Sequence, residues 1–408
     1  MNQPPFGPGL DPGLSKPPPS SLLQEEQPFD RLRANGAGQE TLALYVHWPF
    51  CVSKCPYCDF NSHVRESVDQ AAWRAALLED LAHEARQTPG HGLTSIFFGG
   101  GTPSLMPPAT VAALIEAAEA QWGFADDIEI TLEANPSSVE AARFADLASA
   151  GVNRVSLGIQ SLDDAALRFL GRAHDTHEAL MALGTAQSVF SRISFDLIYA
   201  LPDQSAEAWA AELAEALAFG TTHLSLYQLT IEPGTRFAAL AAKGELVPAD
   251  PDESAALYEL TGAMTAAAGL PAYEISNHAR PGEESRHNLS YWRYQPYAGI
   301  GPGAHGRRGG AFTRRHRKPE NWQAALARNG HGIAEEKAID PAEQGVEALL
   351  MGLRLAEGID RARMDYPVNG EAVARLAGRG LLAEEGTRLR ATPAGMLLLD
   401  SVLAEIVA

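Results

Sequence analysis

The stretch YVHWPFCVSKCPYCDFN fills residues 45–61 and carries every cysteine of the chain, Cys51, Cys55 and Cys58, in the spacing C-x3-C-x2-C. Its first residues are mostly apolar and predict a buried strand that runs into a cysteine loop. An odd number of cysteines packed so closely cannot build a disulfide framework. The loop therefore indicates metal or redox chemistry.

Three thiolates at this spacing can hold three iron atoms of a cubane [4Fe–4S] cluster, because soft sulfur ligands suit iron. The chain has no fourth cysteine, so the fourth iron could be chelated by the amino and carboxylate groups of S-adenosylmethionine (SAM). A zinc site completed by His47 or His63 is an alternative, although structural zinc usually takes two separate C-x2-C pairs. Three unrelated buried thiols are the remaining alternative.

Short apolar runs alternate with longer amphipathic stretches from residue 42 onward, which is typical of repeated β-α units. Strands are expected at 42–49, 95–99, 129–134, 154–160, 192–200 and 223–230. Helices are expected at 107–122, 138–150, 176–190 and 205–218. Because parallel crossovers are right-handed, these units should curl into a full or partial (β/α) barrel. A flat doubly wound sheet is the competing α/β architecture.

Glycines and polar residues stand where several of these strands should end. The second strand runs into GGGTP at residues 99–103, and later strands reach Glu133, Gln160 and Asp196. Each of these side chains alone could simply face water. Because chemistry in barrels collects at the carboxyl ends of the strands, the set predicts a site there.

Four segments are expected: a disordered Pro/Gly-rich extension (1–40), the barrel core (41–235), a region that completes the barrel (236–339) and a C-terminal helical unit (340–408). In the last segment, helices at 341–357, 370–378 and 393–407 and a hairpin resemble a winged helix, with Asp340 and Thr392 as N-caps. Its 11 acidic residues against 7 arginines favour a structural or docking role over DNA binding.

The composition bounds the partners and the compartment. The chain of 408 residues is 45% apolar and has a formal net charge of −19, which disfavours nucleic acids and anionic membranes. No apolar run is long enough to span a bilayer, and the first residues lack the features of a secretory signal. We therefore expect a cytoplasmic protein.

The cysteine loop resembles the hallmark of the radical SAM family. The motifs GGGTP, LEANP, SLGIQS, LGRAH and FDLIYALP follow it in the order found in the branch that contains oxygen-independent coproporphyrinogen III oxidase and its relatives, the haem chaperones. The resemblance covers roughly residues 42–405. It implies a radical SAM barrel that binds a [4Fe–4S] cluster and SAM.

The resemblance also assigns roles to single positions. Cys51, Cys55 and Cys58 would hold the cluster, and Tyr45 and Tyr57 would border it and its bound SAM. The backbone should approach the methionyl part of SAM closely at Gly100, Gly101 and Thr102. The remaining nucleoside, or a second SAM-like ligand, would be held by Glu133, Gln160, Arg172 and Asp196. Arg172 suits a carboxylate, and Asp196 suits ribose hydroxyls or an ammonium group.

Two markers bring the chain nearer to the haem chaperones than to the oxidase. Phe60 stands where the oxidase branch has a fourth cysteine. The segment from His287 to Trp292 matches an HNxxYW segment that the chaperone branch carries and that has been linked to haem binding. His287 could be an axial ligand of haem iron, or a hydrogen-bonded histidine in a packed loop.

The resemblance thus implies a haem chaperone that binds haem as cargo and passes it to acceptor proteins, with the cluster and SAM in a structural or regulatory role. The alternative is an enzyme, a coproporphyrinogen III dehydrogenase that decarboxylates propionates by radical chemistry, against which Phe60 argues. A zinc-stabilised interaction protein that docks through its C-terminal unit is a third interpretation. A membrane-bound acceptor would be met by peripheral contact, and no nucleic acid partner is expected.

A basic stretch stands out in this acidic chain. It consists of Arg307, Arg308, Arg314, Arg315, Arg317 and Lys318. The stretch could meet porphyrin propionates. A solvated hairpin is the interpretation that we favour.

Overall fold

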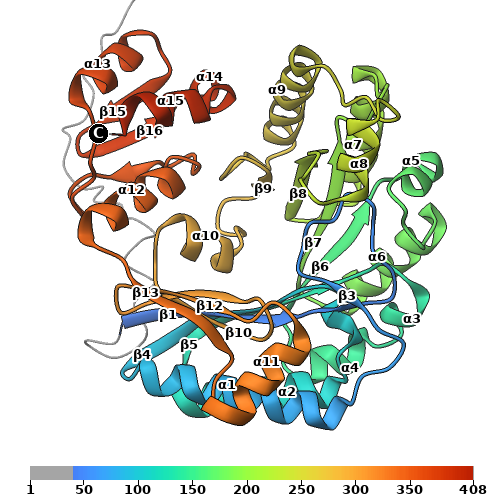
Figure 1. Ribbon diagram of the computed structural model, residues 1–408. Coiled ribbons are helices and arrows are strands. Elements are labelled where there is room, and N and C mark those ends of the chain that lie inside the picture. The colour runs from blue at the N-terminus through green and yellow to red at the C-terminus, as the bar shows by residue number, and fades with distance from the viewer. Residues whose placement is uncertain (1–39, 408) are drawn as a thin grey trace, which may run out of the picture. The chain divides into compact units, whose positions relative to one another are not determined.

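The computed structural model describes residues 40–407, so the extension predicted for residues 1–40 lies, except for Glu40, outside the described part (Figure 1). The predicted β-α alternation is confirmed, and each predicted strand lies within an observed one or overlaps it closely. The six predicted strands, all parallel, are β1 (Glu40–Trp48), β4 (His91–Gly100), β5 (Phe124–Ala134), β6 (Arg154–Gln160), β7 (Arg192–Tyr199) and β8 (His223–Gln228), and β10 (Tyr297–Ile300) also pairs with β1 in parallel.

The strands form one large mixed sheet in the order β13-β12-β11-β10-β1-β4-β5-β6-β7-β8-β9. From β1 to β8 the spatial order follows the chain, so the units wind in one direction and do not reverse as in a doubly wound sheet. Within the described residues β13 and β9 are the two edges, so the barrel is partial. The added strands are β9 (Asn277–Ala279), β10 (Tyr297–Ile300), β11 (His305–Arg308), β12 (Ala311–Arg315) and β13 (Ile333–Ala338).

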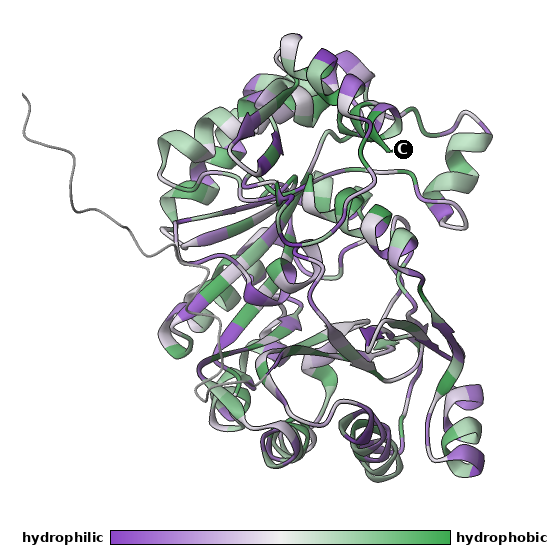
Figure 2. Ribbon diagram, turned by 90° about the vertical axis from the view of Figure 1, so that its left-hand side faces the viewer, coloured by the Kyte–Doolittle hydropathy of each residue, from purple (hydrophilic) through white to green (hydrophobic). Residues whose placement is uncertain are grey.

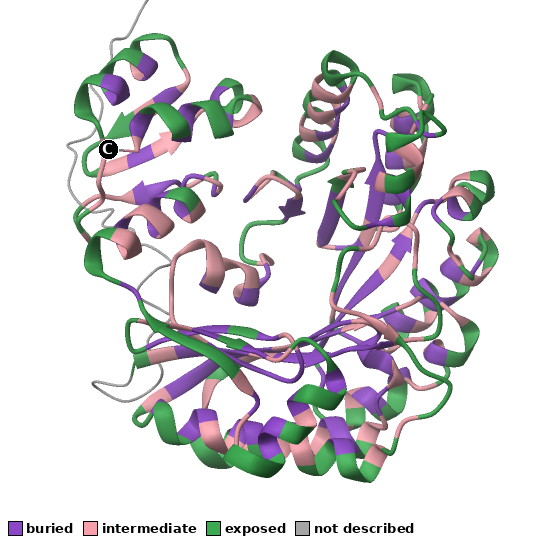
Figure 3. Ribbon diagram, viewed as in Figure 1, coloured by how far each residue is buried: buried purple, intermediate pink, exposed green. Residues whose placement is uncertain are grey.

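Helices cover the outer face of the sheet, whereas the short helix α10 lies against its inner face (Figure 1). Most of the sheet is buried, apart from β13 (Figure 3), and hydrophobic and hydrophilic residues are mixed along its strands (Figure 2). No helix in the described part of the chain is long and apolar enough to cross a membrane. The helices up to residue 329 are α1 (Gln70–Gln87), the 3-10 turn η2 (Pro103–Leu105), α2 (Pro108–Trp122), α3 (Ser138–Ala141), α4 (Phe144–Ser149), α5 (Asp164–Phe169), α6 (Thr176–Val189), α7 (Ala206–Ala218), α8 (Arg236–Ala242), α9 (Pro251–Ala267), α10 (Arg286–Trp292) and α11 (Pro319–Asn329).

The helix predicted at 138–150 is split into α3 and α4. Two side chains at the break are held by the loops after β4 and β5: Glu140 accepts hydrogen bonds from the hydroxyl of Ser104 and the backbone of Asn135, and Arg143 donates to the carbonyls of Ser104 and Met106. These bonds hold the turn between α3 and α4 against the residues that follow the GGGTP loop.

The basic stretch covers the predicted hairpin β11–β12 and the residues after it. The prediction that it is solvated is confirmed for Arg314, Arg317 and Lys318, which are exposed, and wrong for the other three arginines. Arg315 is fully buried, and Arg307 and Arg308 are nearly so. Arg315 donates to the carboxylates of Asp80 at 3.0 Å and Glu84 at 2.7 Å, both on α1, and Arg308 donates to Glu84 at 2.6 Å. The guanidinium groups of Arg308 and Arg315 therefore join the hairpin to α1 inside the protein, where each of these two buried charges meets an opposite one. Arg307 instead donates to the Gln295 carbonyl and lies over the Tyr294 ring.

The C-terminal unit has its own hydrophobic core, which includes Leu349, Leu376, Leu389 and Leu403. The predicted N-caps are confirmed, since the Asp340 carboxylate accepts from the backbone N–H of Glu343 and the Thr392 hydroxyl from that of Gly395. The predicted last helix is split at Leu398. The elements are α12 (Pro341–Gly352), β14 (Ile359–Asp360), α13 (Gly370–Gly378), β15 (Leu382–Glu385), β16 (Arg388–Ala391), α14 (Pro393–Leu397) and α15 (Leu399–Ile406).

Candidate functional site

The cysteine loop follows β1 directly and lies between the short strands β2 (Phe50–Cys51) and β3 (His63–Val64). The three cysteines are free thiols of intermediate exposure. The loop is anchored at its far end by Asn61, whose amide donates to the carbonyls of Pro302 and Arg317 at 2.9 Å. The carboxyl end of β1 therefore presents all three thiols at the predicted edge of the barrel.

The GGGTP loop packs directly against the cysteine loop. The backbone N–H groups of Gly101 and Thr102 donate to the carbonyls of Trp48 and Phe50 at 2.7 and 2.8 Å. A Cβ atom on Gly100, where φ is +118°, would lie 2.7 Å from the His47 ring, and one on Gly101 would lie 2.7 Å from the Phe50 oxygen. Glycine is thus required here by the chain's own packing, in addition to any ligand.

Two polar side chains lie against the thiols. The hydroxyl of Thr102 donates to Cys51 Sγ at 3.6 Å, and Arg172 Nη1 donates to Cys55 Sγ at 3.4 Å. Burial raises the pKa of the Cys51 and Cys58 thiols. Bound iron would offset this effect, because a metal binds the thiolate form.

Several observations test whether the loop fits an iron–sulfur cluster. The soft thiols converge beside a cationic guanidinium, and the buried atoms Ser62 Oγ, His63 Nε2 and Arg172 Nε have no hydrogen-bond partner among the described residues. In residues 40–407 no three ligand-type side chains are placed to hold a single metal ion. A cubane binds each thiolate through a different iron, so its ligands need not converge on one point. The residues present fit the cluster.

The two predicted tyrosines lie on different sides of the loop. Tyr57 packs against Phe237, and its phenol lies near Cys55 and Arg172. Tyr45 lies on β1 and faces the inner side of the sheet, where its hydroxyl is 2.9 Å from His47 Nδ1. His47 Nε2 donates to the Asn61 carbonyl at 2.9 Å, so Nδ1 carries no proton and the Tyr45 hydroxyl donates to it.

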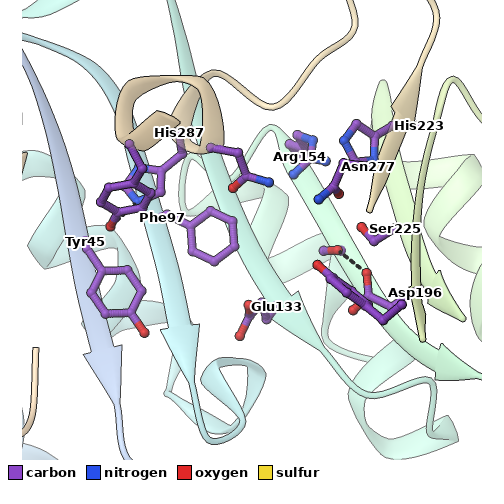
Figure 4. Close-up of a pocket in the computed structure, with 13 residues that line it drawn as sticks. Tyr45, Phe97, Glu133, Arg154, Asp196, His223, Ser225, Asn277 and His287 are labelled. Carbon is purple, nitrogen blue, oxygen red and sulfur yellow. Dashed lines mark hydrogen bonds between the residues drawn. The ribbon is translucent and has the colours of Figure 1, made fainter. Parts of the chain in front are cut away.

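A cavity of about 210 Å³ opens on the inner face of the sheet (Figure 4). Of the predicted site residues, it brings together Tyr45, Glu133, Asp196 and His287. Gly100 connects it to the cysteine loop, since its backbone N–H donates to Glu133 Oε2 at 3.1 Å. The remaining predicted residues, Tyr57, Gly101, Thr102, Gln160 and Arg172, lie at the carboxyl ends of the strands outside the cavity lining.

The two cavity carboxyl groups titrate far above their ordinary range. Burial, reinforced by the charge of Asp196, raises the pKa of Glu133 to about 8, although the Gly100 N–H counteracts it. Burial raises the pKa of Asp196 to about 6 against the hydrogen bonds that it accepts from Ser225 and Ser156. At neutral pH Glu133 is therefore mainly protonated and Asp196 mainly ionised.

Gln160 ends β6 with a φ of +74°, and Ala200 follows β7 with a φ of +56°. Left-handed backbone is unfavourable for side chains other than glycine and recurs at functional sites. Both residues stand at the edge that carries the cysteine loop. The strand ends there are thus held in strained turns around the site.

His287 lies on α10 and is 1% exposed. Its Nδ1 is 3.0 Å from the Ser95 hydroxyl, its Nε2 is 2.9 Å from the Tyr291 hydroxyl, and its ring stacks on Phe97. Burial, followed by the charge of Arg154, lowers the pKa of His287 to about 3, so the ring is neutral. Ligation of haem iron would require one of the two hydrogen bonds to break.

The sequence did not single out several residues that line the cavity, among them Arg154, His223 and Asn277. The sequence does contain a pattern that could have identified them. The strands RVSLGIQ, RISFDLIY and HLSLYQ carry polar residues at alternate positions, such as His223, Ser225 and Tyr227. Alternate residues share one face of a strand, so this pattern marks a polar inner face.

Comparison with known proteins relates this chain to two sequence families. The Radical SAM superfamily matches residues 45–215, and the HemN C-terminal domain matches residues 339–398.

Similar proteins cover most of the chain. Radical S-adenosyl methionine domain-containing protein 1, mitochondrial, of Bos taurus is 38% identical over 95% of this chain and 92% of its own length. Heme chaperone HemW of Escherichia coli (strain K12) is 37% identical over 89% of this chain and 97% of its own length. The solved structure of coproporphyrinogen III oxidase (HemN) from Escherichia coli, a radical SAM enzyme, superimposes with a TM-score of 0.75 over 90% of both chains at 22% identity, a likeness of fold.

Proposed function

Because the chain belongs to the radical SAM superfamily, in the family of the heme chaperone HemW, we propose that it carries a [4Fe–4S] cluster and SAM and that it binds haem and transfers it to acceptor proteins. The observation that carries the proposal is the loop of three free thiols beside a polar cavity. The same loop would hold the cluster through Cys51, Cys55 and Cys58.

The chain's own residues can position SAM. When bound, a reduced cluster supplies an electron to the sulfonium of SAM. Gly100 and Glu133 offer a backbone N–H and a carboxyl group at the border between the loop and the cavity. Arg172, which donates to Cys55, Asn135 and Gly158, is a cation suited to a carboxylate. Asp196 in the cavity and Gln160 at the end of β6 are suited to hydroxyls.

Haem is too large for the cavity as it stands, because even drug-sized ligands usually occupy at least about 300 Å³. Haem would therefore insert only in part, or bind after α10 moves. In the second case Tyr291 would release His287 Nε2, the nitrogen that could then ligate iron. The proposal that His287 is an axial ligand thus includes the loss of the Tyr291 hydrogen bond.

Anaerobic reconstitution tests the cluster. The wild-type protein should turn brown and bind about four iron atoms, and Cys58→Ser should lose most of this iron, whereas Ser53→Ala, in the same loop, should retain it. A wild-type protein that stays colourless and free of iron after reconstitution would overturn the proposal.

Haem titration followed by the Soret band tests the cargo. His287→Ala should weaken binding, whereas His177→Ala, at an exposed histidine of α6, should not. Tyr291→Phe frees Nε2 of His287 and should strengthen binding by roughly two- to tenfold, the equivalent of one hydrogen bond. Equal affinities in the wild type and His287→Ala would remove His287 from the site.

The competing enzyme activity is tested with the same reconstituted protein. SAM, a reductant and coproporphyrinogen III are added under anaerobic conditions, and protoporphyrinogen IX is measured. Phe60, at the position of the oxidase's fourth cysteine, is 59% exposed beside the loop. We expect no protoporphyrinogen IX. Rapid turnover would instead show that the protein is a coproporphyrinogen III dehydrogenase and would overturn the chaperone proposal.

A further inference from the structure

Three buried side chains line the part of the cavity around the first residues of β6 and β8, which we call its inner end: within the described part of the chain, two of them have an unpaired polar atom, and the third is a cation without an ion pair. Arg154, His223 and Asn277 are 3%, 2% and 5% exposed, and all three line the cavity. Figure 4 shows them together, away from Tyr45 and Glu133. Arg154 and His223 are the first residues of β6 and β8, whereas the cysteine loop follows the carboxyl end of β1. They are therefore separate from the residues proposed for the cluster and SAM.

Arg154 is a buried cation that lacks a direct counter-charge. Its Nη2 donates to the Ser194 hydroxyl at 2.9 Å and its Nη1 to that of Thr131 at 3.4 Å, and no carboxylate of residues 40–407 forms an ion pair with it. The nearest link to a carboxylate runs from Ser194 through the Ser156 hydroxyl to Asp196. Since a buried charge is unfavourable without a partner, this position favours an anionic ligand.

His223 offers a second donor. Its Nε2 is 3.0 Å from the Tyr273 hydroxyl. That phenol oxygen also accepts from the Asn288 amide at 3.5 Å, and among the described residues the phenol proton has no acceptor other than His223 Nε2, so the phenol donates to this nitrogen. Burial and the charge of Arg154 lower the pKa of His223 well below its usual value. The neutral ring therefore carries its proton on Nδ1, which is buried and has no partner among the described atoms.

Asn277 adds an acceptor. Its amide Nδ2 donates to the Glu274 carboxylate, so Oδ1 is the atom left over. This oxygen is buried and unpaired within the described part of the chain. Asn277 pairs with Ser225 across β8 and β9, which brings it next to the strand of His223. It can accept a hydrogen bond from a water molecule or from a protonated group of a ligand.

We infer that the inner end of the cavity is a subsite for a carboxylate, with Arg154 and His223 as donors and Asn277 as the acceptor for a water or N–H group beside it. The carboxylate could belong to a small free acid or to a side arm of a larger ligand, such as a porphyrin propionate. Only the second source connects the subsite to the proposed function. The subsite itself does not depend on haem or on the cluster.

Ligand-observed NMR on the full chain tests the subsite with propionate and its neutral amide, propionamide. Propionate should bind at least tenfold more tightly than propionamide, and Arg154→Gln should remove this preference. His223→Ala should weaken propionate binding, and Arg328→Gln, which removes an exposed arginine of α11, should not. Equal binding of propionate and propionamide to the wild type would overturn the inference, and this comparison needs no variant to fold.

Titration with haem and with haem dimethyl ester distinguishes the two sources. A porphyrin arm is the occupant if the wild type prefers haem at least tenfold and Arg154→Gln loses the preference. A small acid is the occupant if Arg154→Gln binds haem normally but not propionate. If Arg154→Gln binds both haem and propionate as the wild type does, the inference is wrong even where haem binding itself is confirmed.

Discussion

Glu133→Gln should change the pH dependence of stability in a direction that the structure fixes. Burial and the charge of Asp196 raise the pKa of Glu133 from 4.5 to about 8 in the folded protein. Between these values the folded protein keeps a proton that the unfolded chain releases. Raising the pH through this window therefore lowers the free energy of unfolding, and glutamine, which cannot ionise, escapes the loss.

The magnitude follows from the shift. At about 1.4 kcal/mol per pKa unit, the raised pKa of Glu133 corresponds to a destabilisation on the order of 5 kcal/mol at pH 9. For a chain of this size, the usual unfolding entropy per residue converts that into roughly 6 °C of melting temperature. At pH 5 the folded protein holds Glu133 protonated, and Glu133→Gln should then melt within about 1 °C of the wild type.

Differential scanning calorimetry of the SAM-free protein at pH 5 and pH 9 measures the effect. Glu116→Gln, at an exposed position of α2, is the control and should leave the melting temperature unchanged at both values. Asp196→Asn removes the negative charge that opposes ionisation of Glu133, so it should lower the pKa of Glu133 in the folded protein. The pH range over which stability falls should then be narrower. If Glu133→Gln shifts the melting temperature equally at pH 5 and pH 9, the carboxyl group is not desolvated as argued.

Three further changes test the buried ion pairs of the hairpin, the GGGTP loop and a helix cap of the C-terminal unit. Arg315→Met removes the cation between Asp80 and Glu84 and should lower the free energy of unfolding by about 3–5 kcal/mol, measured by thermal unfolding. The control Arg328→Met, at the surface, should leave it almost unchanged. Similar melting temperatures of the two variants would contradict the buried ion pairs. Gly100→Ala places a Cβ against His47 in left-handed backbone, so it should lower the free energy of unfolding by about 1–3 kcal/mol and reduce the iron content after reconstitution. The control Gly184→Ala, inside α6 with open space around it, should instead raise the free energy of unfolding by about 0.5–1 kcal/mol. Asp340→Ala removes the N-cap of α12, so it should lower the free energy of unfolding by about 1 kcal/mol and speed amide exchange in the first turn of α12. Glu371→Ala, at a residue that caps no helix, is the control and should not speed this exchange.

The barrel could be predicted from the sequence because its strands and helices are encoded locally. Apolar runs buried on both faces marked the parallel strands, and polar residues at their ends marked the edge with the site. The basic hairpin could not be predicted in the same way. Arg315 can be buried because it forms an ion pair with Asp80, which lies 235 residues away in the chain. No local sequence pattern reveals a partner so distant. A run of arginines near the surface and one inside the protein look alike in sequence.

The candidate site also has a part that is local in sequence and a part that depends on the fold. The three thiols of the cysteine loop lie within eight residues of sequence, so their proximity could be predicted without knowledge of the fold. The cavity depends on strand register: Ser156 pairs with Ser194 and Asp196 with Ser225 across β6, β7 and β8. Each polar residue alone could have faced solvent. Only the curvature of the sheet turns the alternate positions of three strands toward one another.

Haem and a carboxylate make different demands on this cavity. Iron ligation by His287 requires one of its two buried hydrogen bonds to break, and it is the bond to Tyr291 if haem binds after α10 moves. A carboxylate would meet an unpaired donor at His223 Nδ1, and at Arg154 it would compete only with the neutral hydroxyls of Thr131 and Ser194. A propionate arm could therefore enter first and place a porphyrin against α10, where the binding energy of the whole ring is available to displace Tyr291. In that order of events, Arg154→Gln would slow haem association, whereas His287→Ala would mainly speed its release.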